Sequence, residues 1–139
     1  LGLDGTKMSK SRGNTIELGM DADTTARLIR KAVTDSERVI TFEPERRPEV
    51  ANLLMLGGLA TDREPAEIAE EIGDGGGGGL KRFVTEAINS YFAPIRARRA
   101  ELVADPGHLL SVLRAGNDRA NRIADATLDE VRTAMGMKY

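Results

Sequence analysis

Two lysines and two serines lie within five residues near the start of the chain, in Lys7-Met8-Ser9-Lys10-Ser11. Gly5 and Gly13 flank this stretch, which we call the KMSKS loop, and they indicate a loop, not a helix or strand. Its ammonium, hydroxyl and backbone donors suit polyphosphate, because lysine is a compact charge that can follow charge as it moves. Phosphoryl and nucleotidyl transfer depend mainly on positioning and on neutralising charge in the transition state. The alternative is a solvated basic loop without a ligand.

Composition limits what the rest of the chain can do. The 139 residues, 40% hydrophobic and 30% charged, are typical of one soluble globular domain. The formal net charge of −2 means that any RNA binding must rest on local basic patches. The absence of cysteine excludes disulfides and fits the cytoplasm, and a single histidine removes most metal-site and triad hypotheses. No apolar run approaches the length of a membrane span.

Helical periodicity and stop signals predict an all-α bundle with the flexible loop at its amino-terminal end. We expect three shorter helices and two long ones, over residues 24–33, from Pro48 onward, 65–72, 80–104, and from 106 to Gly136. Gly57 and Gly58, inside the second helix, favour close packing of a neighbouring helix. The triplet Thr34-Asp35-Ser36 predicts a structural turn. The glycine run over residues 73–79 predicts a flexible connection, because it lacks the lysine of a phosphate-binding loop.

The first long helix carries an apolar stripe that predicts a core face, and Pro94 is expected to kink it. Beyond the proline lie three arginines, Arg96, Arg98 and Arg99. A solvated face, partly paired with Glu101, and contact with RNA phosphates explain them equally well.

The second long helix is expected to begin at the cap Asp105 and to leave a short tail after Gly136. Its apolar residues at helical spacing, from Leu109 to Met135, predict another core face. Polar side chains gather on its middle turns, at Arg114, Asn117, Asp118, Arg119, Asn121 and Arg122. Guanidinium and amide groups can contact phosphates and unstacked base edges, so this helix is the first candidate for RNA contact.

The KMSKS loop is, letter for letter, the second signature of class I aminoacyl-tRNA synthetases. The order and spacing of four later stretches resemble the carboxyl-terminal part of tryptophanyl-tRNA synthetases, and the resemblance covers essentially the whole chain. These stretches are residues 14–18, 31–36, 93–102 and 115–128. The HIGH-type signature and nearly all of a nucleotide-binding fold are absent, and the chain begins with Leu1. We therefore interpret it as a fragment.

The resemblance implies roles for individual residues. Lys10 would stabilise the pyrophosphate of ATP during amino-acid activation, and Lys7 would support the same phosphates or hold the loop closed. Met8, Ser9 and Ser11 would complete the ATP-binding loop. Residues 1–20 would then be the end of the catalytic domain, and residues 21–139 the helical anticodon-binding domain. The tRNA-contacting residues would be Arg96, Arg99, Arg114, Asn117, Asp118, Arg119, Asn121 and Arg122.

The resemblance also implies a reaction and its partners. A full-length homodimer would couple tryptophan, ATP with magnesium, and tRNA(Trp) to give tryptophanyl-tRNA, AMP and pyrophosphate. The fragment alone is expected to be inactive and to bind no cofactor or metal. Two alternatives stay open. One is another class I synthetase of the tyrosyl type, and the other is a non-catalytic helical module that binds RNA or protein.

Overall fold

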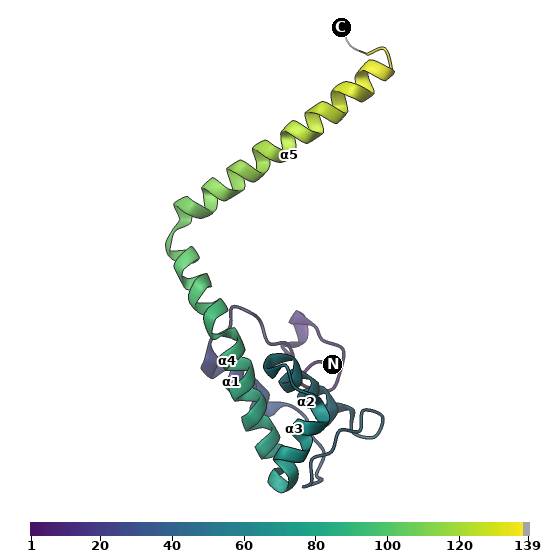
Figure 1. Ribbon diagram of the computed structural model, residues 1–139, viewed down its shortest axis with the longest axis vertical. Coiled ribbons are helices and arrows are strands. Elements are labelled where there is room, and N and C mark those ends of the chain that lie inside the picture. Colours follow the sequence, from purple (N-terminus) through teal and green to yellow (C-terminus); the bar gives the residue numbers. More distant parts are fainter. Residues whose placement is uncertain (138–139) are drawn as a thin grey trace. The chain divides into compact units, whose positions relative to one another are not determined.

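The computed structural model describes residues 1–137, and every regular element in this range is a helix (Figure 1). The α-helices are α1 (Ala22–Lys31), α2 (Pro48–Thr61), α3 (Pro65–Ile72), α4 (Gly76–Ala104) and α5 (Pro106–Ala134), and the 3₁₀ helices are η1 (Lys10–Arg12) and η2 (Gly73–Gly75). The all-α prediction is confirmed. Of the predicted tail, Lys138 and Tyr139 lie outside the described residues. None of the helices described combines the length and apolar character that a membrane crossing requires.

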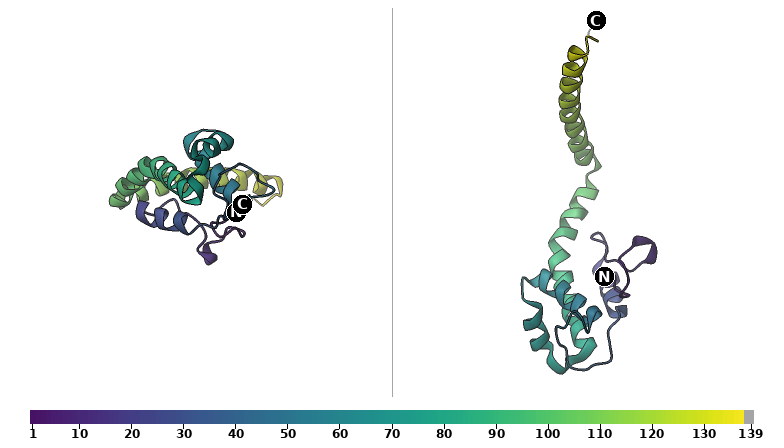
Figure 2. Two further views of the ribbon diagram at one scale, coloured as in Figure 1. Left: turned by 90° about the horizontal axis from the view of Figure 1, so that it is seen from below. Right: turned by 90° about the vertical axis from the view of Figure 1, so that its right-hand side faces the viewer.

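The chain divides into two compact units, Leu1–Ala97 and Arg98–Tyr139. Helix α4 begins in the first unit and ends in the second. The first unit holds the KMSKS loop, α1 to α3 and most of α4. The second holds the end of α4 together with α5, and the right-hand view of Figure 2 shows α5 as one uninterrupted helix. The division into a catalytic part over residues 1–20 and an anticodon-binding part over 21–139 stays a prediction.

The first unit is organised around one hydrophobic core to which four helices contribute. Ile29 of α1, Leu53 and Leu54 of α2, Ile68 of α3 and Leu80 of α4 are at most 1% exposed. Helices α1, α2 and α3 lie around the first part of α4 (Figure 1). Helix α2 is apolar on nearly all sides, and six of its residues are buried. The core therefore fixes where each helix begins relative to the loop.

The helix boundaries follow the chemistry of their terminal residues. Asp21 and Asp105 cap α1 and α5 by accepting from the backbone N–H of the third residue along, at 2.7 and 2.9 Å. Helices α2, α3 and α5 each begin with proline, which lacks an N–H that the first turn would leave unpaired. Pro94 lies inside α4 without ending it. These starts agree with the sequence prediction to within two residues.

The glycine run behaves differently from the prediction. Its first part forms the 3₁₀ helix η2, and Gly76–Gly79 form the first turn of α4, so the prediction of a flexible connection is wrong for these four residues. A Cβ on Gly77 would lie 2.9 Å from Thr34 Oγ1, and one on Gly79 would lie 3.3 Å from Ile72 Cγ2. The helix extends backward from the buried Leu80 because close packing outweighs the poor helix propensity of glycine.

The apolar stripe of α5 is exposed, contrary to the core role predicted for it. No described residue of α5 is buried, and Leu113 and Ile123 are 61% and 62% exposed. Over residues 98–137 the second unit contains only α5 and the end of α4, so this part of it offers no other helix to cover the stripe. An amphipathic pattern predicts that a helix has an apolar face but cannot say what covers it.

The glycine pair in α2 permits the close packing predicted for it. A Cβ on Gly57 would lie 3.0 Å from the ring of Phe83 in α4. A Cβ on Gly58 would lie 2.6 Å from the backbone oxygen of Arg63, which follows the end of α2. The obstacle at Gly58 is backbone, which cannot move aside as a flexible side chain can.

We therefore expect Gly58→Ala to lower the free energy of unfolding by about 1–3 kcal/mol, the usual penalty of overpacking. Gly78→Ala is the matched control, because a Cβ there meets nothing within 4 Å. It should leave the free energy of unfolding unchanged or raise it. Urea denaturation followed by circular dichroism measures both. Equal stability of the two variants would contradict the proposed backbone clash.

Candidate functional site

The KMSKS loop closes around the side-chain amide of Asn14, which is only 5% exposed. The backbone N–H of Ser9 donates to Asn14 Oδ1 at 2.9 Å. Asn14 Nδ2 donates to Asp4 Oδ1 at 2.8 Å and to the Lys7 carbonyl at 3.2 Å. It also lies 3.2 Å from Thr6 Oγ1. One amide thus bonds both the segment before the loop and the loop itself.

Local backbone conformation explains how the loop turns. Ser9 is extended and is followed by the single 3₁₀ turn η1. Gly13 ends that turn with a φ of 62°, and its N–H donates to the Lys10 carbonyl at 3.1 Å. Glycine adopts this left-handed conformation without a steric penalty. Gly2 is required for another reason, because a Cβ there would lie 2.3 Å from Asn14 Nδ2.

The two lysines of the loop carry free charges. Lys7 and Lys10 are exposed, and neither ammonium group has an ion pair or hydrogen bond within residues 1–137. The hydroxyls of Ser9 and Ser11 bond to each other at 2.8 Å. Arg12, in contrast, donates to Thr6 Oγ1 at 3.1 Å. The loop therefore offers two uncommitted ammonium groups to an anion such as a polyphosphate.

Asp4 anchors the cluster as a permanent anion. Hydrogen bonds from the Asn14 side chain and from Thr6 lower the pKa of Asp4 from its usual value to about 2. The carboxylate is therefore ionised throughout the neutral range and acts only as an acceptor. It orients the Asn14 amide by accepting from Nδ2.

The backbone of Leu3 joins the loop to the helical body through two hydrogen bonds. The N–H of Leu3 donates to the Asn14 carbonyl at 3.0 Å, and the Leu3 carbonyl accepts from the N–H of Val33 at 2.9 Å. The Leu3 side chain packs against the hydrophobic core. The loop is thereby held against the end of α1.

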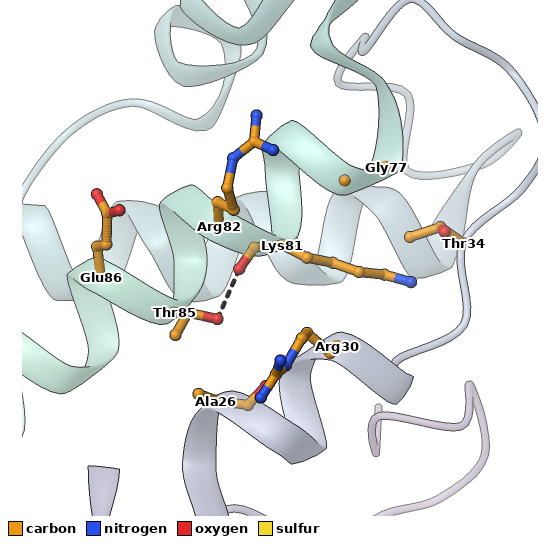
Figure 3. Close-up of a pocket in the computed structure, with 9 residues that line it drawn as sticks. Ala26, Arg30, Thr34, Gly77, Lys81, Arg82, Thr85 and Glu86 are labelled. Carbon is orange, nitrogen blue, oxygen red and sulfur yellow. Dashed lines mark hydrogen bonds between the residues drawn. The ribbon is translucent and has the colours of Figure 1, made fainter. Parts of the chain in front are cut away.

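A second basic feature of the first unit is a groove of about 730 Å³ between α1 and α4, which we call the cationic groove (Figure 3). Lys81 and Arg30 extend into the space between the two helices, whereas the charged ends of Arg82 and Glu86 point away from α1. Thr85 donates to the Lys81 carbonyl at 2.7 Å. The residues that line the groove are Ala26, Arg30, Thr34, Gly77, Gly78, Lys81, Arg82, Thr85 and Glu86.

Sequence reasoning missed this groove. Residues 26 and 30 share one face of α1, and 77, 81 and 85 share one face of α4, as helical spacing requires. Nothing in the sequence says that these two faces meet. The one signal in the sequence is the cluster of cations Arg27, Arg30 and Lys31 near the end of α1.

Thr34 lines the groove, and the next residue, Asp35, forms an ion pair with the buried side chain of Arg47. The side chain of Arg47 is 2% exposed, and two of its nitrogens donate to the Asp35 carboxylate, each at 2.7 Å. It also donates to the Val39 carbonyl at 2.8 Å and to Thr41 Oγ1 at 2.9 Å. The bonds from Arg47 lower the pKa of Asp35. The turn at residues 34–36 is therefore structural, as its residue types predict.

The predicted RNA-contacting arginines of α4 differ in their surroundings. The Arg96 guanidinium donates to Asn89 Oδ1 at 2.8 Å and to Thr25 Oγ1 at 2.9 Å, and it lies 5.7 Å from the Phe92 ring centroid. An RNA contact by Arg96 stays a prediction and would require these bonds to break. Arg98 pairs with Glu101 at 2.9 Å, whereas Arg99 is exposed.

The six predicted residues of α5 lie on consecutive turns of one helix and are all exposed. Arg119 and Arg122 border a shallow depression with Ile123, Ala126 and Thr127. No ion pair within residues 1–137 involves Arg114, Arg119 or Arg122. The helix therefore presents three guanidinium groups that form no ion pair within residues 1–137.

Residues 1–93 match the family of class I tRNA synthetases for tryptophan and tyrosine, and the chain belongs to this family. Its relatives include tryptophan–tRNA ligase 1 of Streptomyces coelicolor, 39% identical over 84% of this chain and 34% of that protein. The tryptophan–tRNA ligase of a Nostoc species is 39% identical over 96% of this chain and 41% of its own length. The chain thus spans about two-fifths of the length of these curated relatives.

Solved structures give the same grouping. The tryptophanyl-tRNA synthetase of Campylobacter jejuni, in complex with ADP and tryptophan, is 29% identical with a TM-score of 0.78. The match covers 98% of this chain and 43% of that one. The same enzyme in a second structure gives a TM-score of 0.75.

The buried pair of Arg47 and Asp35 gives a pH-dependent prediction. We expect Arg47→Met to lower the free energy of unfolding near neutral pH by about 2 kcal/mol, a value reduced because the Asp35 side chain is 34% exposed. The pKa of Asp35 is lowered by folding, so its contribution is present above the unfolded value and disappears as the pH falls through the folded value.

The difference in free energy of unfolding between the unchanged protein and Arg47→Met should therefore shrink below about pH 4. Urea titrations across that range measure it. Arg46→Met is the control, because the Arg46 side chain is 52% exposed. It should lower the free energy of unfolding by less than Arg47→Met does. A difference that stays constant down to the lowest pH would rule out this ion pair as the cause.

Proposed function

We propose that this chain supplies the phosphate-binding loop and the tRNA-binding helices of a tryptophanyl-tRNA synthetase. The observation that carries the proposal is the KMSKS loop, whose two ammonium groups are unpaired while its backbone is held by Asn14. The names of the relatives support tryptophan as the amino acid, and the complex of a neighbour with ADP and tryptophan supports a nucleotide ligand.

The proposed chemistry has two steps. A carboxylate oxygen of tryptophan attacks the α-phosphorus of ATP, and the bond to the bridging oxygen breaks to release pyrophosphate. Lys10 neutralises the negative charge that develops on the departing pyrophosphate, and Lys7 supports the same phosphates. Ser9, Ser11 and the backbone at Met8 supply further donors. A terminal hydroxyl of tRNA then attacks the carbonyl of the adenylate and displaces AMP.

Magnesium would enter with ATP and not through this chain. Within residues 1–137 no group of three or more histidine, aspartate or glutamate side chains could hold a metal ion. We therefore assign no residue of this chain to the metal and derive no step through it. The proposed contribution of these residues is positive charge from the two lysines and hydrogen-bond donors from Ser9, Ser11 and the backbone at Met8.

Two basic surfaces support tRNA binding. The cationic groove brings Arg30 and Lys81 together with two threonine hydroxyls, a combination that suits phosphate and base edges. Helix α5 adds the exposed polar set from Arg114 to Arg122. Phosphate contacts by such groups would provide the salt-dependent part of the affinity. We also propose, from the family resemblance, a cytoplasmic homodimer whose tRNA contacts both subunits.

The first test of this function removes the charge at Lys10. We expect Lys10→Ala, in a complete synthetase carrying this segment, to slow tryptophan-dependent ATP–pyrophosphate exchange on the order of 10²-fold. The KM for tryptophan should change little, because the contact forms mainly in the transition state.

Arg27→Ala is the control for Lys10→Ala, because it removes an exposed cation of α1 that lines neither the loop nor the groove. It should leave the exchange rate unchanged. A normal exchange rate in Lys10→Ala would favour the alternative of a non-catalytic helical module. Exchange that depends on tyrosine would favour the tyrosyl-type alternative.

A second test asks which basic surface binds tRNA. We expect Arg30→Ala and Lys81→Ala each to weaken binding of tRNA(Trp) and to reduce the slope of log affinity against log salt by about 1. Replacing Arg114, Arg119 and Arg122 together should reduce that slope by about 3 if α5 contacts phosphates. Filter binding at several salt concentrations measures both.

Arg27→Ala again serves as the control, because Arg27 lies on α1 outside the face that carries Arg30. An unchanged slope in both groove variants would remove the cationic groove from the proposal. An unchanged slope in the triple variant would remove α5.

A further inference from the structure

The KMSKS loop depends on one buried side chain that does not itself reach the ligand. Asn14 is 5% exposed and lies four residues beyond Lys10. Its amide bonds the backbone N–H of Ser9 and the backbone carbonyl of Lys7, the residues on either side of Met8. The path of the backbone between the two lysines is therefore set from Asn14.

We infer that Asn14 is a positioning residue that holds Lys7 and Lys10 in the geometry required to bind departing pyrophosphate. The inference rests on the proposed function and deepens it. Asn14 acts through the lysines, since its own polar atoms are already bonded to Ser9, Lys7, Asp4 and Thr6. Precise placement of charge matters, because displacement by about 1 Å can cost a large factor in rate.

An amide is the group that fits these partners. Its oxygen accepts from the Ser9 N–H, and its nitrogen donates to both the Asp4 carboxylate and the Lys7 carbonyl. An ionised carboxylate could accept but not donate, and an aliphatic side chain could do neither. The space for the amide exists because residue 2 is glycine, where a Cβ would lie 2.3 Å from Nδ2.

The anchoring is continuous with the body of the protein. The Asn14 carbonyl accepts from Leu3, and Leu3 accepts from Val33 at the end of α1. Asp4 remains ionised because of its bonds to Asn14 and Thr6, which give it a pKa of about 2. The lysines therefore project from a framework that is bonded on both sides and not from a free loop.

Asn14→Asp offers a test that a purely structural residue would not pass. The new carboxylate would face Asp4 across a distance now spanned by a 2.8 Å hydrogen bond, so one of the two carboxyls should have a raised pKa. Arg12 and Lys31 line the same small cavity and will limit the rise. Once protonated, residue 14 can again donate, so acid should restore the loop.

The experiment measures ATP–pyrophosphate exchange in a complete synthetase carrying Asn14→Ala, Asn14→Asp or Asp4→Asn/Asn14→Asp, with Lys10→Ala as the reference. We expect Asn14→Ala to lower the rate about 10-fold with the KM for tryptophan nearly unchanged. The exchange rate of Asn14→Asp should equal that of Asn14→Ala at about pH 8 and should be several-fold higher than it near pH 6. The double variant should recover part of the rate at both pH values.

Asn89→Ala is the matched control, because it removes an amide of the first unit that bonds Ala22 and Arg96, remote in sequence from the loop. It should keep the exchange rate. Trypsin cleavage after Lys7, Lys10 and Arg12 gives a second readout in folded protein, and we expect faster cleavage in Asn14→Ala. Thermal melting identifies any variant that has lost its fold. If Asn14→Ala is such a variant, the recovery of Asn14→Asp activity in acid tests the positioning role instead.

The exchange rates of these variants distinguish a failure of the inference from a failure of the proposed function. A wild-type rate in Asn14→Ala, with a slow Lys10→Ala, overturns the positioning role and leaves the proposed function intact. Parallel pH profiles for Asn14→Asp and Asn14→Ala also overturn it, because they show that no donor is restored. Wild-type rates in both Asn14→Ala and Lys10→Ala overturn the proposed function and the inference with it.

Discussion

Buried polar side chains must find their hydrogen-bond partners inside the protein, and this constraint organises the irregular parts of the first unit. Asn14, Thr25 and Arg47 are its buried polar residues. Each leaves bulk water only because protein groups replace its hydration, and an unmet group would cost about 1–3 kcal/mol. Asn14 holds the KMSKS loop, Arg47 holds the turn beside the groove, and Thr25 accepts from Arg96 to join α1 to α4.

The hydrophobic core has a simpler task, which is to place the helix ends from which these polar anchors act. Ile29 lies near the end of α1, and the Leu3–Val33 bond follows directly after that helix. Leu80 fixes the first turns of α4, where Gly77 lies against Thr34. Packing of the core gives the helices most of their positions, and hydrogen bonds to buried groups then fix the loops between them.

Sequence patterns predicted what depends on neighbours in the chain. Caps such as Asp21 and Asp105, prolines at first turns and the KMSKS loop itself are local signals, and the structure bears out the helix starts. The flexible connection predicted for Gly76–Gly79 is wrong, because the contact between Gly77 and Thr34 that favours the helix joins residues far apart in the sequence. The cationic groove and the exposed stripe of α5 depend on which faces meet, and that information is not local.

Some cations of the first unit pair with carboxylates and others do not, and the lysines of the loop and the groove belong to the unpaired group. Arg46, Arg47 and Arg63 each pair with a carboxylate, whereas the ammonium groups of Lys7, Lys10 and Lys81 have no such partner within residues 1–137. A paired cation must break an ion pair before it can bind an anion, and an unpaired one loses only water. The chain as a whole carries a net charge of −2, so attraction of a polyanion cannot come from its overall charge. Unpaired lysines on a fixed backbone give local attraction where it is useful, and the buried amide of Asn14 supplies that fixed backbone without competing for the ligand.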